Sequence, residues 1–527
     1  MRFFNTAGPV NETDHYCLPP LERLDPDYMN LLIEQKKYFV LHAPRQTGKT
    51  SSLLALMNHL NSERKYRSLY VNAEVGQSAG EDVKRGIKAI LSELATCAHV
   101  FLKDEFLEKR WREVLNENGE DAALGKMLTL WAEESSKPLI LMIDEIDSLI
   151  GNTLISVLRQ LRTGYTRRPL SFPQSIVLCG VRDVRDYRIH SSQNKEIITG
   201  GSAFNIKAVS LRLGDFTQKE IASLYQQHTE ETGQIFTEDA LETAWRLTEG
   251  QPWLINALGY EACFNMKTGQ NRTDAITASM MDQAGDNIIL RRDTHIDQLL
   301  DKLREKRVRN VIEPILVGKS FEGDFNIEDI QYVIDIGLIR RSQNGEILIT
   351  NRIYQEIIPR ELSWSTQMGI HEKTLRYVLP DGRLDMKRLL SAFQDFFRKH
   401  SEHWMGRFDY KEAGPQLLMQ AFLQRIINSG GRVEREYGLG MMRTDLLIIW
   451  KYENKIQEIV IELKLLYESP EQTLKKGLKQ TWGYMDKCGT DEGYLIIFDR
   501  TPHKSWDEKI YQYEKEFQGK KIQVWGM

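Results

Sequence analysis

The sequence has few cysteines, and none of them forms a CxxC pair. The five thiols are scattered along 527 residues, at Cys17, Cys97, Cys179, Cys263 and Cys488. We therefore expect reduced, mostly buried cysteines and no zinc site. No uninterrupted apolar run approaches the roughly 18 residues of a membrane span. The opening MRFFNTAGPV has no basic region ahead of a long apolar core, so it predicts a cytoplasmic protein with no secretory signal and no membrane partner.

An excess of positive charge is also missing. Lysine and arginine together number 70, against 74 aspartate and glutamate residues, which gives a net charge of −4 at pH 7. Such a chain has no overall attraction to nucleic acid, so binding of that kind must use a local basic patch. The length predicts three or four domains, and an apolar content of 41% with 27% charged residues is ordinary for a soluble protein.

The strongest motif in the first half is YFVLHAPRQTGKTSSLLALM, in which an apolar strand over 38–42 runs into a loop and an amphipathic helix. This is the P-loop pattern, with Ala43 where the first glycine usually stands and with Gly48, Lys49 and Thr50 intact. Gly48 lets backbone N–H groups approach the phosphates, Lys49 reaches the β- and γ-oxygens, and the Thr50 hydroxyl can ligate Mg²⁺. The alternative is a loop that has lost this function, and Ala43 is the only departure in its favour.

A second motif, PLILMIDEIDSLI, places two carboxylates after an apolar run over 139–143. A continuous apolar run is typical of a strand that is buried on both faces of a parallel sheet. Asp144 and Glu145 follow at its carboxyl end, where α/β sheets bind their ligands. Asp144 would hold Mg²⁺, directly or through water, and Glu145 would activate the water that attacks the γ-phosphate. An acidic loop without function is the alternative for this segment alone.

Two further apolar runs, at 68–72 and 175–180, predict two more strands. The second run ends in VRDVRD, so Arg182 or Asp183 would either sense the γ-phosphate from the strand tip or be a solvated loop charge. Candidates for lining an adenine pocket, or only for packing on the domain, are His15, Tyr16 and residues 19–23. Candidates for an arginine finger between subunits, or for plain surface charges, are Arg159, Arg162, Arg167 and Arg168.

Together these motifs resemble the additional-strand P-loop ATPases, in the AAA-like branch close to the signalling ATPases with numerous domains. The stretch TEGQPWLINAL supports this resemblance, because Gly250, Gln251 and Pro252 match the GxP motif in the helical lid of that group. A plain turn between two lid helices is the alternative. The resemblance implies ATP and Mg²⁺ as ligands, a homo-oligomer, an ATPase core over 1–215 and a lid over 216–290. It also implies that Pro252 lies near the adenine.

The middle of the chain, residues 291–365, mixes helical and hairpin signals. NIEDIQYVIDIGLIRR has apolar residues at helical spacing, and LIRRSQNGEILIT predicts two short strands around an Asn-Gly turn. This order predicts a winged-helix-like domain. Its helix suits a transmitter of the nucleotide state better than a DNA reader, because it carries the acidic residues Glu328, Asp329 and Asp335. Residues 366–408 are predicted to be a helical linker.

Near the C-terminus, MMRTDLLIIWK and IQEIVIELKLL are apolar with a period of two, which predicts two strands. If the loop between them is centred between Glu453 and Asn454, position 445 lies opposite position 462 in an antiparallel pair. Asp445 and Glu462 then share a face with Lys464, two residues further on. Carboxylate oxygens suit Mg²⁺, which polarises a phosphoryl oxygen while a neighbouring ammonium steadies the developing charge. The arrangement predicts a phosphodiester-cleaving site.

Residues 409–527 are predicted to form a mixed sheet with a helix on either side. Asp445 followed by Glu462-Leu463-Lys464 resembles the signature of the PD-(D/E)XK nuclease superfamily, although Thr444 stands where the name of the motif has proline. The resemblance implies a restriction-endonuclease-like domain. It also implies a metal site for Mg²⁺ or Mn²⁺, with a nuclease-like binding domain that has lost its metal site as the alternative.

Two further features support this second resemblance. Gln480 and Tyr484 lie at i, i+4 on the next predicted helix and resemble the QxxxY motif of the exonuclease-like branch, where that pair approaches DNA beside the metal. Lys476, one turn earlier, would share their face and meet a phosphate. Glu412 opens the first helix and matches an acidic residue that many members present to the metal.

Two functions are therefore open for a predicted α/β protein with a P-loop ATPase core, a helical lid, a winged-helix-like connector and a nuclease-like domain. The first is an ATP-regulated, Mg²⁺-dependent nuclease, with DNA preferred over RNA by resemblance alone. Whole chains of this layout resemble bacterial fusions linked to defence against foreign DNA or to mobile elements. The second is an ATP-driven switch or scaffold whose nuclease-like domain binds nucleic acid or a partner without cleaving.

Overall fold

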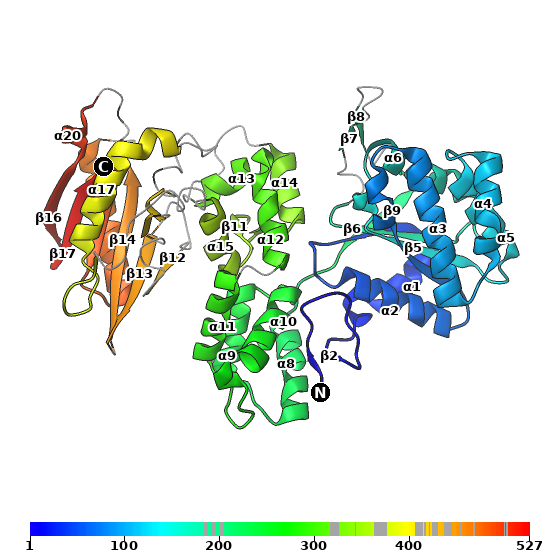
Figure 1. Cartoon of the computed structure of the whole chain (residues 1–527), viewed down its shortest axis with the longest axis horizontal. Helices are drawn as coiled ribbons and strands as arrows, with labels where there is room; N and C mark the ends of the chain where they lie inside the picture. The colour runs from blue at the N-terminus through cyan, green and yellow to red at the C-terminus, as the bar shows by residue number, and fades with distance from the viewer. Residues whose placement is uncertain are drawn as a thin grey trace. The chain divides into compact units, whose positions relative to one another are not determined.

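The computed structural model divides the chain into two compact units (Figure 1). The first comprises Met1–Leu290 with Asp335–Gly337, and the second comprises Arg291–Ile334 with Leu338–Met527. The structure describes residues 1–183, 188–190, 197–199, 204–291, 294–316, 326–342, 344–362, 377–405, 415, 418–420, 422–423, 431–436, 445–453, 455–466, 469–499, 501 and 504–527. Among the helices of these ranges, none is both long and apolar enough to cross a membrane.

The first unit is built on a parallel sheet of five strands in the order β4-β5-β6-β3-β9. The bounds are β3 (Tyr38–His42), β4 (Arg67–Asn72), β5 (Leu139–Asp144), β6 (Ser175–Gly180) and β9 (Lys207–Arg212). The four apolar runs that predict strands all fall within these bounds, so those strands are confirmed. A short antiparallel ribbon follows β6 and pairs β7 (Arg188–His190) with β8 (Ile197–Thr199).

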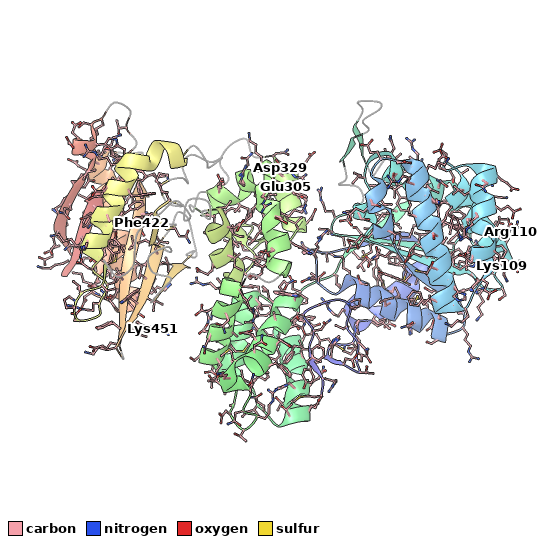
Figure 2. The ribbon with its side chains drawn as sticks, viewed as in Figure 1. Lys109, Arg110, Glu305, Asp329, Phe422 and Lys451 are labelled. Carbon is pink, nitrogen blue, oxygen red and sulfur yellow. The ribbon has the colours of Figure 1, made fainter. Side chains whose placement is uncertain are left out.

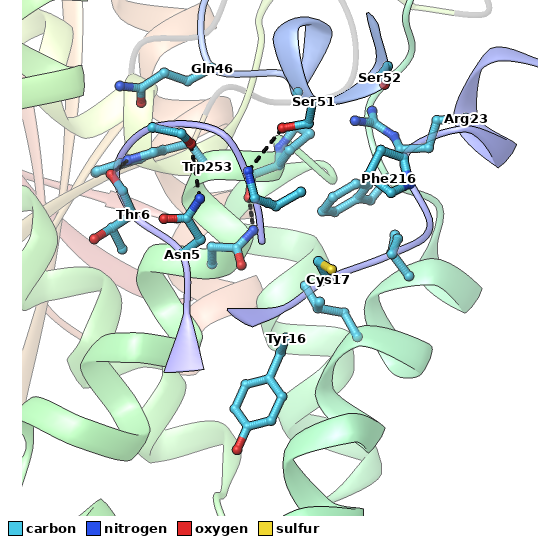
Figure 3. Close-up of a pocket in the computed structure, with 18 of the residues that line it drawn as sticks. Asn5, Thr6, Tyr16, Cys17, Arg23, Gln46, Ser51, Ser52, Phe216 and Trp253 are labelled. Carbon is cyan, nitrogen blue, oxygen red and sulfur yellow. Dashed lines mark hydrogen bonds between the residues drawn. The ribbon is translucent and has the colours of Figure 1, made fainter. Parts of the chain in front are cut away.

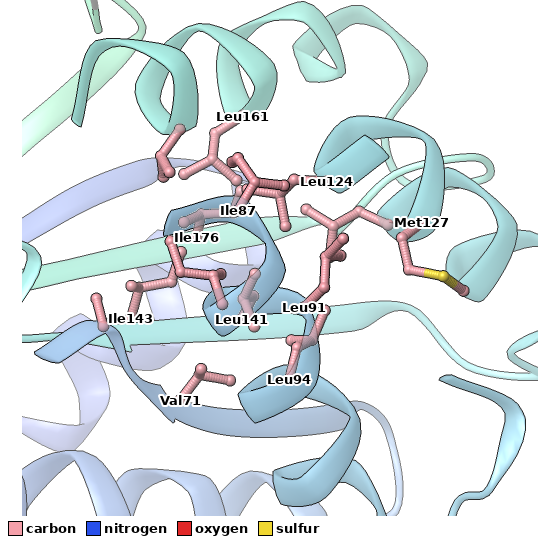
Figure 4. Close-up of a cluster of buried hydrophobic side chains, with 14 of the residues drawn as sticks. Val71, Ile87, Leu91, Leu94, Leu124, Met127, Leu141, Ile143, Leu161 and Ile176 are labelled. Carbon is pink, nitrogen blue, oxygen red and sulfur yellow. The ribbon is translucent and has the colours of Figure 1, made fainter. Parts of the chain in front are cut away.

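Both faces of this sheet are buried, which explains the continuous apolar runs. Helices α3 (Val83–Leu102), α4 (Phe106–Asn118), α5 (Ala123–Glu134) and α6 (Gly151–Thr163) share one core with Val71, Leu141 and Ile143 (Figure 4). Helices α1 (Pro26–Glu34) and α2 (Lys49–Ser62) share the other core with Tyr70, Met142 and Cys179. Alternate residues of each strand therefore point to opposite faces, and those at even positions of β4 and β5 point toward α2.

The segment predicted to be the lid, residues 216–290, is mainly helical and contacts the start of the chain; we keep the name lid for it. Its helices are α8 (Gln218–Thr232), α9 (Glu238–Thr248), α10 (Pro252–Tyr260) and α11 (Ala278–Arg291). The strands β1 (Phe3–Phe4) and β2 (His15–Tyr16) form a parallel pair, and the Tyr16 hydroxyl lies 3.3 Å from Nδ1 of the buried His228 on α8. Phe4 is also buried, so the first residues of the chain are part of the lid core.

The second unit begins with helices and a small hairpin. The bounds are α12 (Thr294–Asp301), α13 (Lys306–Leu316), α14 (Ile327–Asp335), β10 (Ile339–Arg341), β11 (Ile347–Ile349) and α15 (Arg352–Leu362). Strands β10 and β11 pair antiparallel around Gly345, whose φ of 83° suits a glycine turn. The predicted helix followed by a hairpin is therefore confirmed.

The rest of the second unit is a mixed sheet of six strands in the order β12-β13-β14-β15-β17-β16. Pairs β14/β15 and β15/β17 are parallel, and the other neighbours are antiparallel. The bounds are α17 (Met386–Met405), β12 (Gly431–Glu436), β13 (Asp445–Tyr452), β14 (Lys455–Leu465), α19 (Pro470–Cys488), β15 (Gly493–Phe498), α20 (Trp506–Lys509), β16 (Tyr511–Phe517) and β17 (Lys520–Gly526). The hairpin of β16 and β17 was not predicted.

The helix α17 lies within the predicted helical linker over 366–408 and packs on the sheet. Its Leu389 and Phe393 are fully buried against one face of the sheet, in a core that includes Ile461 of β14. Phe422 joins them, with its ring centroid 5.2 Å from that of Phe393 (Figure 2). An apolar helix face of this size needs a partner, and here the sheet provides it, so α17 is part of the sheet domain.

Candidate nucleotide site and candidate metal site

The loop between β3 and α2 has the geometry of a phosphate-binding loop. Gly48, with φ of 94°, stands directly before Lys49, where α2 begins. Glycine adopts such a φ without strain, and it leaves the backbone N–H groups at the start of the helix open to an anion. The Lys49 ammonium donates hydrogen bonds to the backbone oxygens of Ala43 and Pro44, each at 2.9 Å. Phosphate oxygens are stronger acceptors than these neutral carbonyls, so the ammonium can exchange them for a nucleotide.

Several donors hold the Asp144 carboxylate at the end of β5, and the buried Cys179 thiol of β6 is one of them. The Thr50 hydroxyl donates to Oδ2 at 2.7 Å, the Tyr70 hydroxyl donates to Oδ2 at 3.1 Å, and the Glu145 N–H donates to Oδ1 at 2.9 Å. Asp144 is fully buried, so these bonds replace the water that its charge has lost. Burial and the Asp144 charge raise the pKa of the Tyr70 phenol far above its usual range, so Tyr70 remains a donor.

The oxygens of Thr50 and Asp144 fit a magnesium ion. A hydroxyl and a carboxylate are hard donors of the kind that Mg²⁺ accepts, and they lie 2.7 Å apart at the start of α2. The Thr50 hydroxyl gives its single hydrogen to Asp144, which leaves its lone pairs for a cation. The two residues that were each predicted to hold Mg²⁺ are therefore in direct contact.

Glu145 directly follows Asp144 and has an unusual backbone. Its φ of 49° is left-handed, a conformation that non-glycine residues adopt rarely and often at functional sites. Burial raises the pKa of its carboxyl, and the charges of Asp147 and Asp144 act in the same direction, while Lys49 opposes them. A carboxylate with a raised pKa is a stronger base, which suits the activation of a water.

Arg182 and Asp183, at the tip of β6, both form ion pairs. Arg182 Nε lies 3.2 Å from Oδ2 of Asp335, one of the three later residues that belong to the first unit. Asp183 pairs with Lys207 at the start of β9. The side chain of Arg182 is 13% exposed and Asp183 is buried, so neither is a solvated loop charge.

The other arginine candidates include two that pack on aromatic rings of their own unit. The guanidinium of Arg168 lies 3.4 Å from the centroid of the Tyr165 ring. That of Arg167 lies 5.5 Å from the centroid of Phe172. Stacking of this kind stabilises the local fold, so these two are held by their own unit.

A cavity of about 110 Å³ lies beside the loop (Figure 3). Its walls come from the N-terminal segment, from the loop and α2, and from the lid, and include Tyr16, Arg23, Gly48, Ser51, Phe216 and Pro252. Tyr16 and Arg23 were candidates for such a pocket. His15, another candidate, instead packs on Phe3 with ring centroids 4.7 Å apart.

The N-terminal segment forms a wall of this cavity that the sequence did not predict. The Ser51 hydroxyl of α2 accepts from the Val10 N–H at 3.1 Å, and the Trp253 indole of α10 donates to the Thr6 oxygen at 2.8 Å. These contacts join residues more than 40 positions apart, and no local pattern in the sequence signals them. The N-terminal segment therefore contacts both α2, which follows the loop, and α10 of the lid.

Backbone geometry explains the Gly-Gln-Pro motif of the lid. Gly250 has φ of 82°, and a Cβ at this position would lie 2.0 Å from the backbone oxygen of Phe216. The Phe216 N–H in turn donates to the Gly250 oxygen at 2.8 Å. Pro252 then begins α10, where a missing N–H is harmless, and it faces the cavity.

In the second unit, the pairing of β13 with β14 follows the predicted register. Position 445 pairs with Glu462, and Tyr452 pairs with Lys455 around the turn, so this prediction is confirmed. Glu462 is fully buried and forms an ion pair with Lys464, whose side chain is 18% exposed. Both lie on the face toward α19, because Val460, two residues earlier, packs in the core under that helix.

The helix α19 crosses that same face. Tyr484 is buried in the core between the helix and the sheet, whereas Gln480 is half-buried and Lys476 is exposed. The close approach is possible because a Cβ on Gly477 would lie 2.6 Å from Leu495 of β15. Of the predicted pair, Gln480 therefore reaches the surface, and Tyr484 packs inside.

The described residues do not complete a metal site in this unit. Glu412 lies outside them, and Asp445 is described by its backbone alone. Within the described part of the chain, no three His, Cys, Asp or Glu side chains gather as a metal site would need. The structure thus places the Glu462 carboxylate and the Lys464 ammonium on one face of the sheet, with position 445 paired to Glu462 on the neighbouring strand.

Comparisons with known proteins cover most of the first unit and the beginning of the second. A family model for an AAA-like domain matches residues 22–357. The Walker-type ATPase PABY2304 of Pyrococcus abyssi is similar at 14% identity and a TM-score of 0.45, over 67% of this chain and 99% of that one. Cdc6p of Pyrobaculum aerophilum is similar at 14% identity and a TM-score of 0.35, over 69% and 96% of the two chains. The RuvB Holliday junction branch migration motor of Thermotoga maritima has 13% identity and a TM-score of 0.34, over 64% and 93%. No curated protein matches the chain.

Proposed function

The chain belongs to the AAA-like domain family of P-loop ATPases, and on that premise we propose that its ATP state regulates a metal-dependent nuclease site in the C-terminal sheet. The proposed substrates are ATP and nucleic acid, with DNA favoured by resemblance. The ATPase half is supported by the contacts of Lys49, Thr50 and Asp144 around one loop.

In the proposed reaction, the residues of the first unit bind and orient ATP. Lys49 exchanges the carbonyls of Ala43 and Pro44 for phosphate oxygens, and the backbone at Gly48 donates to the same phosphates. The base enters the cavity beside Pro252. Thr50 and Asp144 would hold Mg²⁺, which supplies charge stabilisation for the phosphoryl group. Glu145 accepts the proton of the attacking water.

The nuclease half is supported by the pairing of position 445 with Glu462 on the same face as Lys464. In the proposed site, Asp445, Glu462 and Glu412 would hold Mg²⁺ or Mn²⁺, which polarises the scissile phosphate. Lys464 steadies the charge that develops on the phosphate. Gln480 and the exposed Lys476 would meet the nucleic-acid backbone.

One observation favours a second candidate function, in which the C-terminal sheet binds nucleic acid or a partner without cleaving. Glu462 is fully buried, and its partner is Lys464. A buried carboxylate that is already neutralised by an ammonium has less need of a metal. The chain would then be an ATP-driven switch or scaffold.

Purified protein with Mg²⁺ or Mn²⁺ distinguishes the two candidates. Plasmid, linear and single-stranded DNA, and RNA, are incubated with and without ATP. Cleavage that is abolished by Lys464→Ala and by chelation supports the nuclease. Survival of every substrate together with a gel shift supports the scaffold instead.

The regulatory link is proposed to run through the lid and the tip of β6. ATP would close the lid around Pro252 and would compete with Asp335 for Arg182, because phosphate and carboxylate both bind guanidinium groups strongly. Hydrolysis through Glu145 would reset the site. A homo-oligomer and a role in defence against foreign DNA or in mobile-element biology belong to the same proposal. Particle mass with and without ATP and DNA tests the oligomer.

A further inference from the structure

We propose that Tyr70 is a positioning residue for the Mg²⁺ site, which holds the Asp144 carboxylate in the orientation that the metal requires. Tyr70 lies outside the P-loop and outside the Asp144-Glu145 motif, so no pattern in the sequence assigns it a role. The inference rests on the proposed binding of ATP with Mg²⁺.

The order of the strands brings the two residues together. Strand β4 is the direct neighbour of β5, with Tyr70 paired to Met142 and Asn72 paired to Asp144. Tyr70, Met142 and Asp144 occupy even positions of these strands and point to the face that α2 covers. Tyr70 therefore reaches diagonally across to Asp144, with its hydroxyl oxygen 3.1 Å from Oδ2.

The hydrogen bonds of the carboxylate show what this contact adds. Oδ2 accepts the hydrogens of Thr50 and Tyr70, and Oδ1 accepts the N–H of Glu145. The Cys179 thiol of β6, a weak donor, also hydrogen-bonds to this carboxylate. Thr50 and Glu145 belong to the motifs, and Tyr70 is the hydroxyl donor that comes from a separate strand. With all three in place, the carboxylate cannot turn about its Cβ–Cγ bond without losing a bond.

Loss of the Tyr70 hydroxyl would therefore act on the metal and not on the nucleotide directly. Groups that orient a metal ligand typically contribute 10- to 100-fold to metal affinity, and we expect a loss in that range. The P-loop contacts of Gly48 and Lys49 do not involve Tyr70. Affinity for nucleotide without metal should stay within about twofold of the wild type, a negligible difference in free energy.

A plain packing role for Tyr70 is the competing explanation, because a buried tyrosine hydroxyl usually finds some partner. Tyr38 provides the matched control. It is fully buried in the neighbouring part of the same sheet, and its hydroxyl donates to the Pro173 oxygen at 3.0 Å. Tyr70→Phe and Tyr38→Phe each remove one buried hydroxyl and keep the ring.

The test measures binding of a fluorescent ATP analogue to the full chain as a function of Mg²⁺ and, separately, in EDTA. Circular dichroism verifies that both variants are folded. We expect Tyr70→Phe to need about 10- to 100-fold more Mg²⁺ than the wild type to reach half of the Mg²⁺-dependent gain in nucleotide affinity. Its affinity for the nucleotide in EDTA should be unchanged. Tyr38→Phe should match the wild type in both conditions.

Two outcomes overturn the inference. One is a Mg²⁺ dependence of Tyr70→Phe equal to that of the wild type. The other is an equal loss of affinity with and without Mg²⁺, which a structural role would produce. If the wild type itself binds no nucleotide, it is the proposed function that fails, so the two failures remain distinguishable. Should Tyr70→Phe not fold, Tyr70→Leu, which also removes the hydroxyl, must show the same higher Mg²⁺ requirement, and wild-type Mg²⁺ dependence in a folded Tyr70→Leu counts against the inference.

Discussion

The nucleotide site and the candidate metal site are assembled by different means. Lys49 and Thr50 are consecutive at the start of α2, and Asp144 reaches Thr50 from β5, which β6 separates from β3 in the sheet, through a 2.7 Å hydrogen bond. The placement of position 445 beside Glu462 and Lys464 depends instead on the register of β13 against β14. A one-residue slip of that hairpin would put position 445 on the opposite face from these two residues. A contiguous loop protects the first site from such an error.

The two lysines also differ in their partners. Lys49 donates to two neutral carbonyls, so an incoming phosphate improves its hydrogen bonding. Lys464 neutralises the buried carboxylate of Glu462, so any metal must replace or share that interaction. We therefore expect the nucleotide site to be ready for its ligand and the metal site to need rearrangement.

The largest expected effect is on the second site. Lys464→Ala should lower cleavage on the order of 10³-fold, because the developing charge loses its cation. It should also destabilise the second unit, since the buried Glu462 carboxylate loses the Lys464 ammonium. Cleavage assays and urea unfolding measure the two effects. Lys451→Ala, at the exposed tip of β13 (Figure 2), is the control and should change neither. Cleavage that survives Lys464→Ala would remove the lysine from the chemistry.

The next effect concerns hydrolysis at the first site. Glu145→Gln should lower ATP turnover by about 10²- to 10⁴-fold, the range for loss of a general base, and should leave ATP binding intact. Phosphate release and nucleotide binding are measured on the same preparation. Wild-type turnover in this variant would mean that another group activates the water.

Nucleotide affinity should respond to the loop lysine. Lys49→Ala is expected to weaken ATP binding by about 100-fold, because a charged hydrogen-bonding group worth some 3 kcal/mol is lost. Equilibrium binding measures this. Lys65→Ala removes a lysine whose ion pair with Glu34 is exposed and should have no effect. An equal loss in both variants would point to general charge and not to the loop.

A smaller effect tests the lid. Gly250→Ala should lower stability by about 1–2 kcal/mol from its positive φ alone, with a further cost from contact with the Phe216 oxygen. It should also weaken ATP binding several-fold, because Pro252 moves with it. Gly233→Ala has a similar φ of 77° and open space around the Cβ, so it should show the strain without the loss of affinity. Thermal unfolding and ATP titrations compare the two, and equal affinities would separate the lid turn from the cavity.

The smallest effect is a shift in pH dependence. Burial raises the pKa of Glu145, so its carboxyl is protonated up to a higher pH than an ordinary glutamate. Because the base must be ionised, ATP turnover should fall as the pH drops through this raised pKa. This fall in turnover at low pH should be absent from the residual activity of Glu145→Gln. A fall that occurs only at the pH of an ordinary glutamate would contradict the role of burial.

Local patterns were sufficient for the parts of the fold that are contiguous in sequence. The loop around Lys49, the strand before Asp144 and the register that pairs position 445 with Glu462 were all predicted, because spacing or a short turn determines each of them. Contacts between distant segments were missed. Tyr70 reaches Asp144 because β4 lies next to β5, and nothing in either strand specifies that order.

The same limit applies to α17. An apolar helix face indicates burial but does not identify the surface that covers it, so Phe393 was consistent with a linker as well as with a sheet domain. The N-terminal wall at Val10 was missed for a similar reason, because its partner Ser51 lies 41 residues away. Motifs of catalytic and ligand-binding residues are therefore easier to predict from the sequence than the distant residues that position them.

Regulation of the second site by the first is tested most directly by DNA cleavage in Mg²⁺, with and without ATP, by the wild type, Lys49→Ala and Lys464→Ala. We predict that the rate of DNA cleavage by the wild type changes when ATP is added. Lys464→Ala should not cleave in either condition, and Lys49→Ala should cleave at a rate that is the same with and without ATP. Cleavage by Lys49→Ala with the rate and the ATP dependence of the wild type would contradict the regulation.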